Sequence, residues 1–422
     1  SKLDYIEKVE AVAPGFINFY LSKQYLVDQL AAGHALQGQA LRGKKIMVEF
    51  TDPNPFKEFH IGHLYSNAVG ESLSRLFEVQ GAEVWRVNYQ GDIGLHVAKA
   101  IWGIQNGGVK MDDFEKKSLE ERVEVLGQCY AAGSRAYEEN EAAKKEINEI
   151  NKKVYEEEDP EITEIYKKGR EWTLDYFEVV YKRLGTTFIR YYFESEVGPL
   201  GLVLVKEHVK DGVFKESDGA IIFEGEKHGL HNRVFINSLG LPTYEAKDLG
   251  LPPTKYKDFK YDQSIIVTGN EINAYFKVLL KALSLINADL AAKTLHIGHG
   301  MVRLPGGKMS SRTGSVIAGE WLLDEAKRRI QKAYPEMDGA TAEKVTIGAV
   351  KWALLKSGIG KDLAFDFDSS ISLEGDSGPY VQYTYARTQS VLAKWKVESG
   401  KLKIKKNLKS QISALNSKPK NC

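Results

Sequence analysis

The sequence predicts an α/β protein built on a parallel sheet. Between residues 43 and 110, short apolar runs alternate with helical patterns, as in strands and helices wound into such a sheet. The chain has 422 residues, so two or three domains are expected. Apolar residues make up 43% of the chain and charged residues 27%, a composition that provides a core and excludes general disorder.

Charge and cysteine content exclude several classes of function. The 58 Lys and Arg residues nearly balance the 57 Asp and Glu residues, so any anion site must be a local patch. The cysteines, Cys129 and Cys422, exclude a disulfide scaffold and a zinc site of paired cysteines, and they favour a reducing, cytosolic setting. No apolar run approaches the roughly 20 residues that cross a bilayer, so no membrane role is expected.

The first strand-helix-strand unit can be placed from its apolar pattern. Residues 44–50 (KKIMVEF) predict a buried strand, and residues 51–57 a loop broken by proline. Residues 64–80 have the apolar face of a helix, which Gly81 ends. Residues 83–89 (EVWRVNY) are rich in β-branched and aromatic residues and predict the next strand.

The rest of the chain alternates helical and strand-like regions. Residues from about 111 to 184 are charged and Ala-rich with apolar residues at helical spacing, which predicts a helical insertion. Three further strands are expected at residues 220–224, 233–237 and 264–268, as the second half of the α/β domain. The chain is mostly helical again beyond Trp321.

A His-Ile-Gly-His tetrapeptide at residues 60–63 lies between the first loop and its helix. Free backbone N–H groups and the positive end of the helix dipole favour a phosphate there, and two imidazoles add donors. Gly62 leaves room for a nucleotide to approach the backbone. The same four letters recur at residues 296–299 before a strand-like run, without a helix, and we attribute that copy to chance and loop packing.

A second candidate motif is the loop at residues 305–314 (PGGKMSSRTG). It presents an ammonium, a guanidinium and several hydroxyls between glycines, and such a loop can close on a polyphosphate. Taken alone, a basic glycine-rich loop is more often a solvated surface loop.

Together, His-Ile-Gly-His and Lys-Met-Ser-Ser-Arg resemble the paired signatures of class I aminoacyl-tRNA synthetases. Four further segments are similar to arginyl-tRNA synthetases: VEFTDPNP at 48–55, NYQGDIG at 88–94, PTYEAKD at 242–248 and GPYVQY at 378–383. The resemblance covers roughly residues 10–390. It implies the Rossmann-like nucleotide-binding domain of class I synthetases, with a helical insertion and a mostly helical C-terminal part. ATP, L-arginine and an arginine-accepting tRNA are the substrates that it implies.

The resemblance also implies site residues. The catalytic set is His60, His63 and Lys308, which with Gly62, Met309, Ser310 and Ser311 would bind ATP. Glu194, Tyr244 and Asp248 match the readers of the arginine side chain, and a guanidinium with five donors does require carboxylates and a partner in its plane. Glu49 and Asn54 match the readers of the α-amino and carboxyl ends. Glu271 stands where the family usually has histidine or glutamine, which makes it the weakest assignment.

The mechanism that the resemblance implies is attack of the arginine carboxylate on the α-phosphorus of ATP, then transfer of arginine to the 2′-hydroxyl of the terminal ribose of tRNA. The two histidines and Lys308 would stabilise the charge that grows on the phosphoryl oxygens. Mg²⁺ is expected with ATP, held by phosphates and water. We expect a cytoplasmic monomer.

Three regions are expected along the chain. Residues 1–42 resemble the end of a tRNA-contacting N-terminal domain, residues 43–375 a catalytic domain, and residues 376–422 the start of a helical anticodon-binding domain. Because both ends are short for the family, we expect complete arginine and ATP sites but weakened tRNA binding.

Two other functions remain open at this stage. One is a catalytically silent synthetase-like protein that binds tRNA or a partner, against which the intact His60, His63 and Lys308 argue. The other is a class I synthetase of another specificity, against which the acidic pocket argues, since only a cationic substrate makes unpaired buried carboxylates tolerable.

Overall fold

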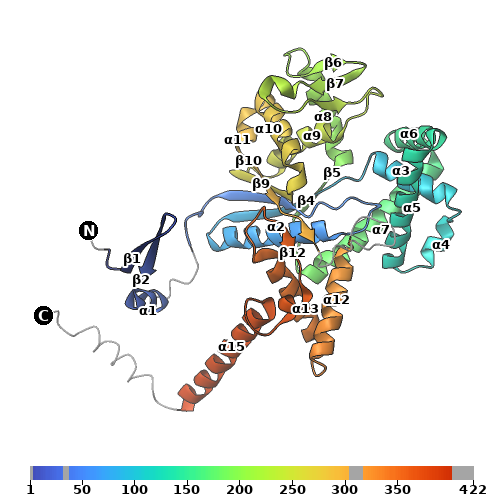
Figure 1. The fold of residues 1–422 in the computed structure, drawn as a ribbon. Coiled ribbons are helices and arrows are strands. Elements are labelled where there is room, and N and C mark those ends of the chain that lie inside the picture. The colour runs from blue at the N-terminus through green and yellow to red at the C-terminus, as the bar shows by residue number, and fades with distance from the viewer. Residues whose placement is uncertain (1–2, 32–37, 304–316, 402–422) are drawn as a thin grey trace.

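The computed structural model describes residues 3–31, 38–303 and 317–401. Its centre is a parallel sheet with the strand order β10-β9-β3-β4-β5 (Figure 1). The strands are β3 (Lys45–Phe50), β4 (Glu83–Gln90), β5 (Arg190–Phe193), β9 (Gln263–Gly269) and β10 (Thr294–His299). The predicted α/β class is therefore confirmed. The chain places β4 on one side of β3 and β9 on the other, which makes a topological switch point where parallel sheets bind ligands.

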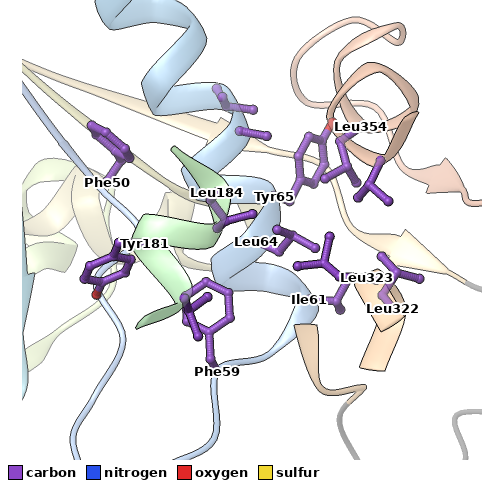
Figure 2. Close-up of a cluster of buried hydrophobic side chains, with 14 of the residues drawn as sticks. Phe50, Phe59, Ile61, Leu64, Tyr65, Tyr181, Leu184, Leu322, Leu323 and Leu354 are labelled. Atoms are coloured by element: carbon purple, nitrogen blue, oxygen red, sulfur yellow. The ribbon is translucent and has the colours of Figure 1, made fainter. Parts of the chain in front are cut away.

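Alternate side chains of the central strands pack into separate cores on opposite faces of the sheet. Ile46, Val48 and Phe50 belong to one core, and Met47 to the other. Figure 2 shows the first core, in which side chains of α2 meet Leu322, Leu323 and Leu354. Three of the helices that contribute to this core are α2 (Ile61–Val79), α12 (Gly319–Ala333) and α13 (Gly339–Leu355), and the C-terminal part of α7 (Pro160–Leu184) adds Tyr181 and Leu184.

The second core covers the opposite face of the sheet. Met47 and Ile266 of the strands contribute buried side chains to it, and so do four helices, for example with Leu249. These helices are α8 (Glu194–Glu207), α9 (Tyr244–Asp258), α10 (Asn273–Ile286) and α11 (Ala288–Ala292). Because Glu49 is two residues from Met47 in β3, its side chain points to this face.

The predicted insertion is helical and has a core of its own. Ile101 and Leu126 pack there against Ile147 and Trp172, all buried. The elements within the predicted bounds are α4 (Met111–Glu115), α5 (Leu119–Glu139), α6 (Glu141–Glu156) and α7 (Pro160–Leu184). The preceding helix α3 (Leu95–Asn106) lies outside these bounds and contributes to the same core. These helices stand to one side of the central sheet (Figure 1).

Two predicted strands do not belong to the central sheet. Residues 220–224 and 233–237 form β7 (Ala220–Phe223) and β8 (Arg233–Ile236), which pair with β6 (Lys215–Ser217) in a separate antiparallel sheet. Asp218 and Gly219 join β6 to β7 with φ angles of 50° and 77°, the geometry of a tight hairpin. The links are too short for the crossover that parallel pairing requires, so these two predicted strands form a separate sheet and do not extend the central one.

Two strands of the central sheet, β5 and β10, were not predicted. β5 has only four residues and β10 contains the second His-Ile-Gly-His copy, so neither shows an extended apolar run. The helix predicted at 64–80 begins earlier, at Ile61, because His60 caps it. The strand at 264–268 is confirmed as β9.

The remaining described elements lie near the two ends of the chain. Residues before the sheet form a hairpin and a helix, and residues after it are mostly helical, as predicted. They are β1 (Ile6–Val12), β2 (Phe16–Leu21), α1 (Lys23–Ala31), β11 (Val302–Arg303), β12 (Leu363–Ala364), α14 (Phe367–Ile371) and α15 (Gly378–Lys401). Within the described ranges, no helix is both long and apolar enough to cross a membrane. The boundaries of the three expected domains stay predictions.

Candidate active site

A cavity of about 690 Å³ lies at the carboxyl ends of the central strands. Residues that follow each of the five strands line it, among them Thr51, Gly91, Glu194, Glu271 and Gly300. The cavity also brings together the described site residues that the sequence suggested: Glu49, Asn54, His60, Gly62, His63, Glu194, Tyr244, Asp248 and Glu271. Lys308, Met309, Ser310 and Ser311 lie outside the described residues.

His60 and His63 cap the N-terminus of α2 reciprocally. The Nδ1 atom of His60 accepts hydrogen bonds from the backbone N–H groups of Gly62 at 3.1 Å and His63 at 3.4 Å. The Nδ1 atom of His63 accepts one from the backbone N–H of His60 at 3.2 Å. The two rings stack with centroids 3.5 Å apart. This is a capping box built from imidazoles, and it fixes both rings at the cavity.

Both histidines are neutral at physiological pH. Burial, reinforced by the charge of Lys57, lowers the pKa of His60 to about 4. Burial, with His60 and Lys57 adding to it, lowers the pKa of His63 well below its usual value. Since each Nδ1 accepts a hydrogen bond, the single proton of each neutral ring is on Nε2. The pair therefore offers two hydrogen-bond donors without a charge.

The expectation of free backbone donors at this helix end was wrong. The N–H of Ile61 donates to the carbonyl of Ile317 at 2.9 Å, and those of Gly62 and His63 donate to the His60 ring. The capping box consumes the groups that would otherwise bind a phosphate. Gly62 has a local role as well, because a Cβ there would lie 3.0 Å from the His60 ring.

The opposite part of the cavity is acidic. Tyr244 begins α9 and Asp248 follows one turn later, so both reach the cavity as their spacing predicted. The Oδ1 atom of Asn54 accepts a hydrogen bond from the N–H of Gly91 at 3.0 Å. A Cβ on Gly91 would lie 2.5 Å from that oxygen and 3.0 Å from Oε1 of Glu194. Glycine is thus required for Asn54 and Glu194 to converge here.

Asp248 is a buried carboxylate of the cavity wall without a cationic partner among the described residues. Burial raises its pKa to about 8, against the hydrogen bond that Tyr275 donates at 2.5 Å. The charges of Glu194 and Glu49 raise it further. Among residues 3–31, 38–303 and 317–401, no basic side chain forms an ion pair with Asp248. A bound guanidinium would supply the missing positive charge.

Two other carboxylates are already paired, contrary to the expectation of unpaired acids. The Nζ atom of Lys247 lies 2.6 Å from Oε2 of Glu194, and Nζ of Lys255 lies 2.7 Å from Oε2 of Glu49. All four side chains are at most 5% exposed. Burying a carboxylate without a partner is costly, and the two lysines of α9 offset that cost.

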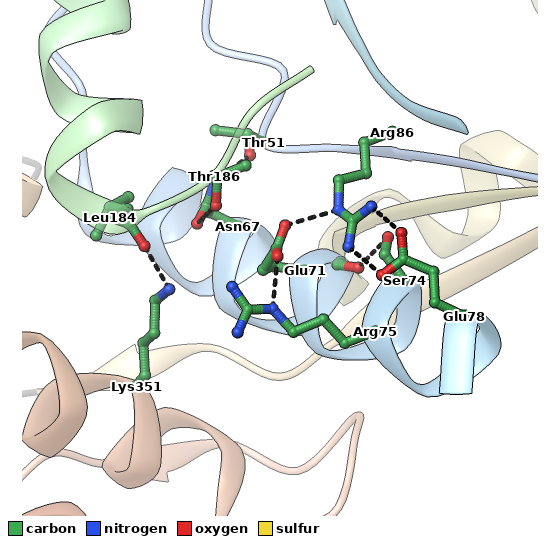
Figure 3. A network of polar contacts seen from close by, with 11 residues as sticks. Thr51, Asn67, Glu71, Ser74, Arg75, Glu78, Arg86, Leu184, Thr186 and Lys351 are labelled. Carbon is green, nitrogen blue, oxygen red and sulfur yellow. Dashed lines mark hydrogen bonds and ion pairs between the residues drawn. The ribbon is translucent and has the colours of Figure 1, made fainter. Parts of the chain in front are cut away.

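The loop after β3 has an unusual backbone. Thr51 and Asp52 have φ angles of 81° and 46°, a region that β-branched residues rarely adopt. Thr51 is fixed by Ser66, whose Oγ accepts from its N–H at 2.9 Å, and by Asn67, which donates to its hydroxyl at 3.0 Å. Figure 3 shows the Asn67 contact continuing to Thr186. The strain is held in place by buried hydrogen bonds, and it directs Asp52 and Asn54 to the cavity.

The second His-Ile-Gly-His copy is not a loop. Residues 296–299 pair with β9 as the last four residues of β10. His299 lines the cavity, is 2% exposed and packs against Tyr65 in a tilted arrangement, with ring centroids 4.4 Å apart. Its Nδ1 faces the carbonyl of Gly300 at 2.8 Å, while its Nε2 is buried without a partner among the described residues. Parallel pairing with β9 therefore overrides the interpretation as loop packing.

Glu271 lies at the rim of the cavity, in the short 3₁₀ helix η2 (Asn270–Ile272), and is exposed. Its carboxylate folds back over Gly269, where a Cβ would lie 2.1 Å from Oε2. The charge of Glu271 raises the pKa of His299, although burial lowers it more.

Sequence reasoning missed several residues of this cavity. Asp52, Tyr89, Lys255, Tyr275 and His299 line it, and Lys247 lies directly behind Glu194. Lys247 and Asp52 occur inside segments that the resemblance rests on, so their position was a usable signal. Lys255, Tyr275 and His299 carry no such signal, because only the packing of α9, α10 and β10 brings them to the site.

Comparison with known proteins identifies the family. The model of the family "tRNA synthetases class I (R), catalytic domain" matches residues 26–367. The chain belongs to this family of class I arginyl-tRNA synthetases. The arginine–tRNA ligase of Treponema denticola is 33% identical over 94% of this chain and 69% of that protein. That of Borreliella burgdorferi is 32% identical over 93% of this chain and 70% of that protein.

Solved structures agree on the fold. Arginyl-tRNA synthetase from Thermus thermophilus superposes with a TM-score of 0.68 at 22% identity, covering 93% of this chain and 71% of that one. The enzyme from Plasmodium falciparum gives a TM-score of 0.66 at 23% identity, with 93% and 69% covered. The predicted family, ligase class and class I fold are confirmed. The chain spans 63 to 70% of the length of the first curated relatives.

Proposed function

We propose that the cavity activates L-arginine with ATP and that the chain then transfers the arginyl group to tRNA. The observation that carries this proposal is one cavity with two chemically different parts. Uncharged imidazole donors lie on α2, and carboxylates lie around Gly91 and on α9. The first part suits the phosphates of a nucleotide, and the second suits a cationic amino acid.

In the proposed complex, Glu194 and Asp248 accept hydrogen bonds from the guanidinium while Tyr244 lies beside it. Glu49 and Asn54 receive the α-amino and carboxyl ends, and Glu271 contributes from the rim. Asp248 becomes fully ionised on binding, because the guanidinium favours the charged form of a carboxylate whose pKa burial has raised to about 8.

The chemical step forms a bond between an arginine carboxylate oxygen and the α-phosphorus, while the bond from that phosphorus to the pyrophosphate oxygen breaks. The Nε2–H groups of His60 and His63 donate to the phosphoryl oxygens as charge grows there, and Lys308 would supply a positive charge. Gly62, Met309, Ser310 and Ser311 complete the proposed ATP site.

Magnesium enters this proposal as the counter-ion of ATP. Within the described ranges, no group of three or more His, Cys, Asp or Glu residues is arranged to hold a metal. Phosphate oxygens and water are therefore the expected ligands, and the protein contributes position rather than a metal cage.

Calorimetric titration of L-arginine in the presence of a non-hydrolysable ATP analogue tests the proposal, with L-lysine and L-glutamine as competitors. Glu194→Gln and Asp248→Asn should each weaken arginine binding about 10- to 100-fold, because each removes a charged hydrogen bond to the guanidinium. ATP-analogue affinity should stay unchanged. The control Glu207→Gln alters an exposed residue of the same helix as Glu194.

Wild-type affinity for arginine should rise from pH 7 to pH 9, since Asp248 ionises near pH 8, and Asp248→Asn should abolish that rise. Unchanged arginine affinity in both acidic-site variants would refute the pocket. A tRNA-dependent pocket and a silent scaffold would both show no arginine binding at first, and added tRNA would restore it only in the former. Filter binding tests the separate expectation that tRNA affinity is weak.

A further inference from the structure

In the ion pair between Lys247 and Glu194, the carboxylate faces the cavity and the lysine lies behind it. Glu194 contributes to the cavity wall, whereas Lys247 does not and is 3% exposed. The lysine approaches Oε2 of Glu194 at 2.6 Å. The other oxygen, Oε1, lies on the side of Gly91 and Asn54, both of which line the cavity. Lys247 therefore pairs with Oε2 on the side away from the cavity, and Oε1 lies on the side where the substrate is proposed to bind.

The position of Lys247 is fixed from several elements. Its Nζ also donates to the backbone carbonyl of Ile93 at 3.0 Å. It lies 5.3 Å from the ring centre of Tyr244 and 5.8 Å from that of Tyr155 in the helical insertion. The absence of a side chain at Gly94 makes room for it, because a Cβ there would lie 3.2 Å from Nζ. The ammonium is therefore held in a prepared place rather than free to leave with a substrate.

We propose that Lys247 is a positioning residue for arginine recognition. It pairs with Oε2 of Glu194, keeps that carboxylate ionised and oriented, and leaves Oε1 to accept a hydrogen bond from the guanidinium. This inference rests on the proposed arginine site and adds to it a residue that need not touch the substrate.

The electrostatics of the pair agree with this role. Burial raises the pKa of Glu194, and the charge and hydrogen bond of Lys247 oppose that rise. Burial alone would lower the pKa of Lys247, but Glu194 raises it, so the lysine stays charged. Besides Lys247, the charged groups that shift the pKa of Glu194 are Asp92, which raises it, and Lys57, which lowers it. The charge of Glu194 in turn raises the pKa of its titratable neighbours Tyr89, Tyr155, Tyr244, Asp248 and Tyr275.

Removal of the lysine charge should make arginine binding depend on pH through Glu194. In Lys247→Met, the pKa of Glu194 rises further, and the protonated acid no longer binds the guanidinium as an anion. We expect arginine affinity at pH 6.5 to fall at least tenfold relative to the wild type. The ratio of wild-type to variant affinity should then shrink as pH rises to 9, by up to about tenfold per pH unit. The charge of Glu194 also raises the pKa of Asp248, so the two carboxylates titrate together, and the ratio removes only the part of the Asp248 titration that both proteins share.

The measurement is the same calorimetric titration at pH 6.5, 7.5, 8.5 and 9, with ATP-analogue affinity measured in parallel. Lys247→Arg should restore the ion pair and most of the arginine affinity. Lys257→Met is the matched control, because Lys257 is an exposed residue of the same helix. A ratio that stays constant across this pH range, or equal affinity in wild type and Lys247→Met, would overturn the inference.

A double variant tests whether Lys247 acts through Glu194, and it leaves neither residue as a buried charge without its partner. If Lys247 acts through Glu194, then Glu194→Gln/Lys247→Met should bind arginine as weakly as Glu194→Gln alone, within about twofold. A further large loss in the double variant would show that the lysine acts in another way. Absence of arginine binding by the wild type, with tRNA present, would refute the proposed function itself, which separates the two failures.

Discussion

The tetrapeptide His-Ile-Gly-His occurs twice in this chain and has two different structures. At residues 60–63 it begins α2, and its two rings stack on each other with centroids 3.5 Å apart. At residues 296–299 it ends β10 and pairs in parallel with β9. In the second copy the rings are separated, because His296 stacks on Phe276 and His299 packs at a tilt against Tyr65.

The difference follows from the two backbone periods. In a helix, residues three apart lie on one side, so His60 and His63 meet and present donors to the same ligand. In a strand, residues three apart point to opposite faces, so His296 and His299 cannot act together. A short motif therefore has chemical meaning only when the backbone brings its side chains to one place.

The largest expected effect separates the two copies by activity. His63→Ala should lower arginine-dependent ATP–pyrophosphate exchange about 10²- to 10³-fold with tRNA present, because it removes a donor to the charged phosphoryl group. His296→Ala should change the exchange rate less than about threefold, since His296 bonds to Thr268 at 2.7 Å and does not line the cavity. Similar losses in both variants would remove the functional distinction between the copies.

Replacing the glycine should affect stability more in the second copy than in the first, the reverse of the order expected for activity. At Gly298 a Cβ would lie 2.1 Å from the Asn273 side chain and 3.0 Å from the Asn270 backbone. We expect Gly298→Ala to lower the free energy of unfolding by about 1–3 kcal/mol, seen in the thermal midpoint. At Gly62 a Cβ would meet only the His60 ring, at 3.0 Å. Gly62→Ala should leave the midpoint nearly unchanged and lower the exchange rate, and a large drop in its midpoint would contradict this account.

The smallest expected effect concerns a property that both copies share: each contains a partly buried histidine that is neutral near pH 7. Burial is the main cause that lowers the pKa of His60 and of His296 to about 4 each. The unfolded chain takes up these protons near pH 6.5 and the folded protein only near pH 4, so stability falls as pH drops through this window. His296→Gln should reduce that slope by about 1 kcal/mol per pH unit at most, in urea unfolding from pH 7 to 4.5. An unchanged slope would mean that His296 takes up its proton at the same pH in the folded and the unfolded chain, so that burial does not lower its pKa.

Much of the fold and the candidate site could be predicted from local sequence. The apolar run at residues 45–50 could be recognised as a buried strand because it is short and is flanked by Gly43 and Pro53, and the insertion as helical because its apolar residues recur at helical spacing. The residues suggested for arginine and ATP came from motifs in the family's order, and the described ones line one cavity. Local patterns and motif order carry this information because they depend on residues close in sequence.

Only the tertiary structure decided the rest. Lys247 and Lys255 neutralise Glu194 and Glu49 across 53 and 206 positions of sequence, and no local pattern reports such a partner. Pairing with β9 makes residues 296–299 a strand, and a short hairpin removes β7 and β8 from the central sheet. The physical reason is the same in each case. Strand pairing and the burial of charge depend on which distant groups come into contact, so they are properties of the packed chain.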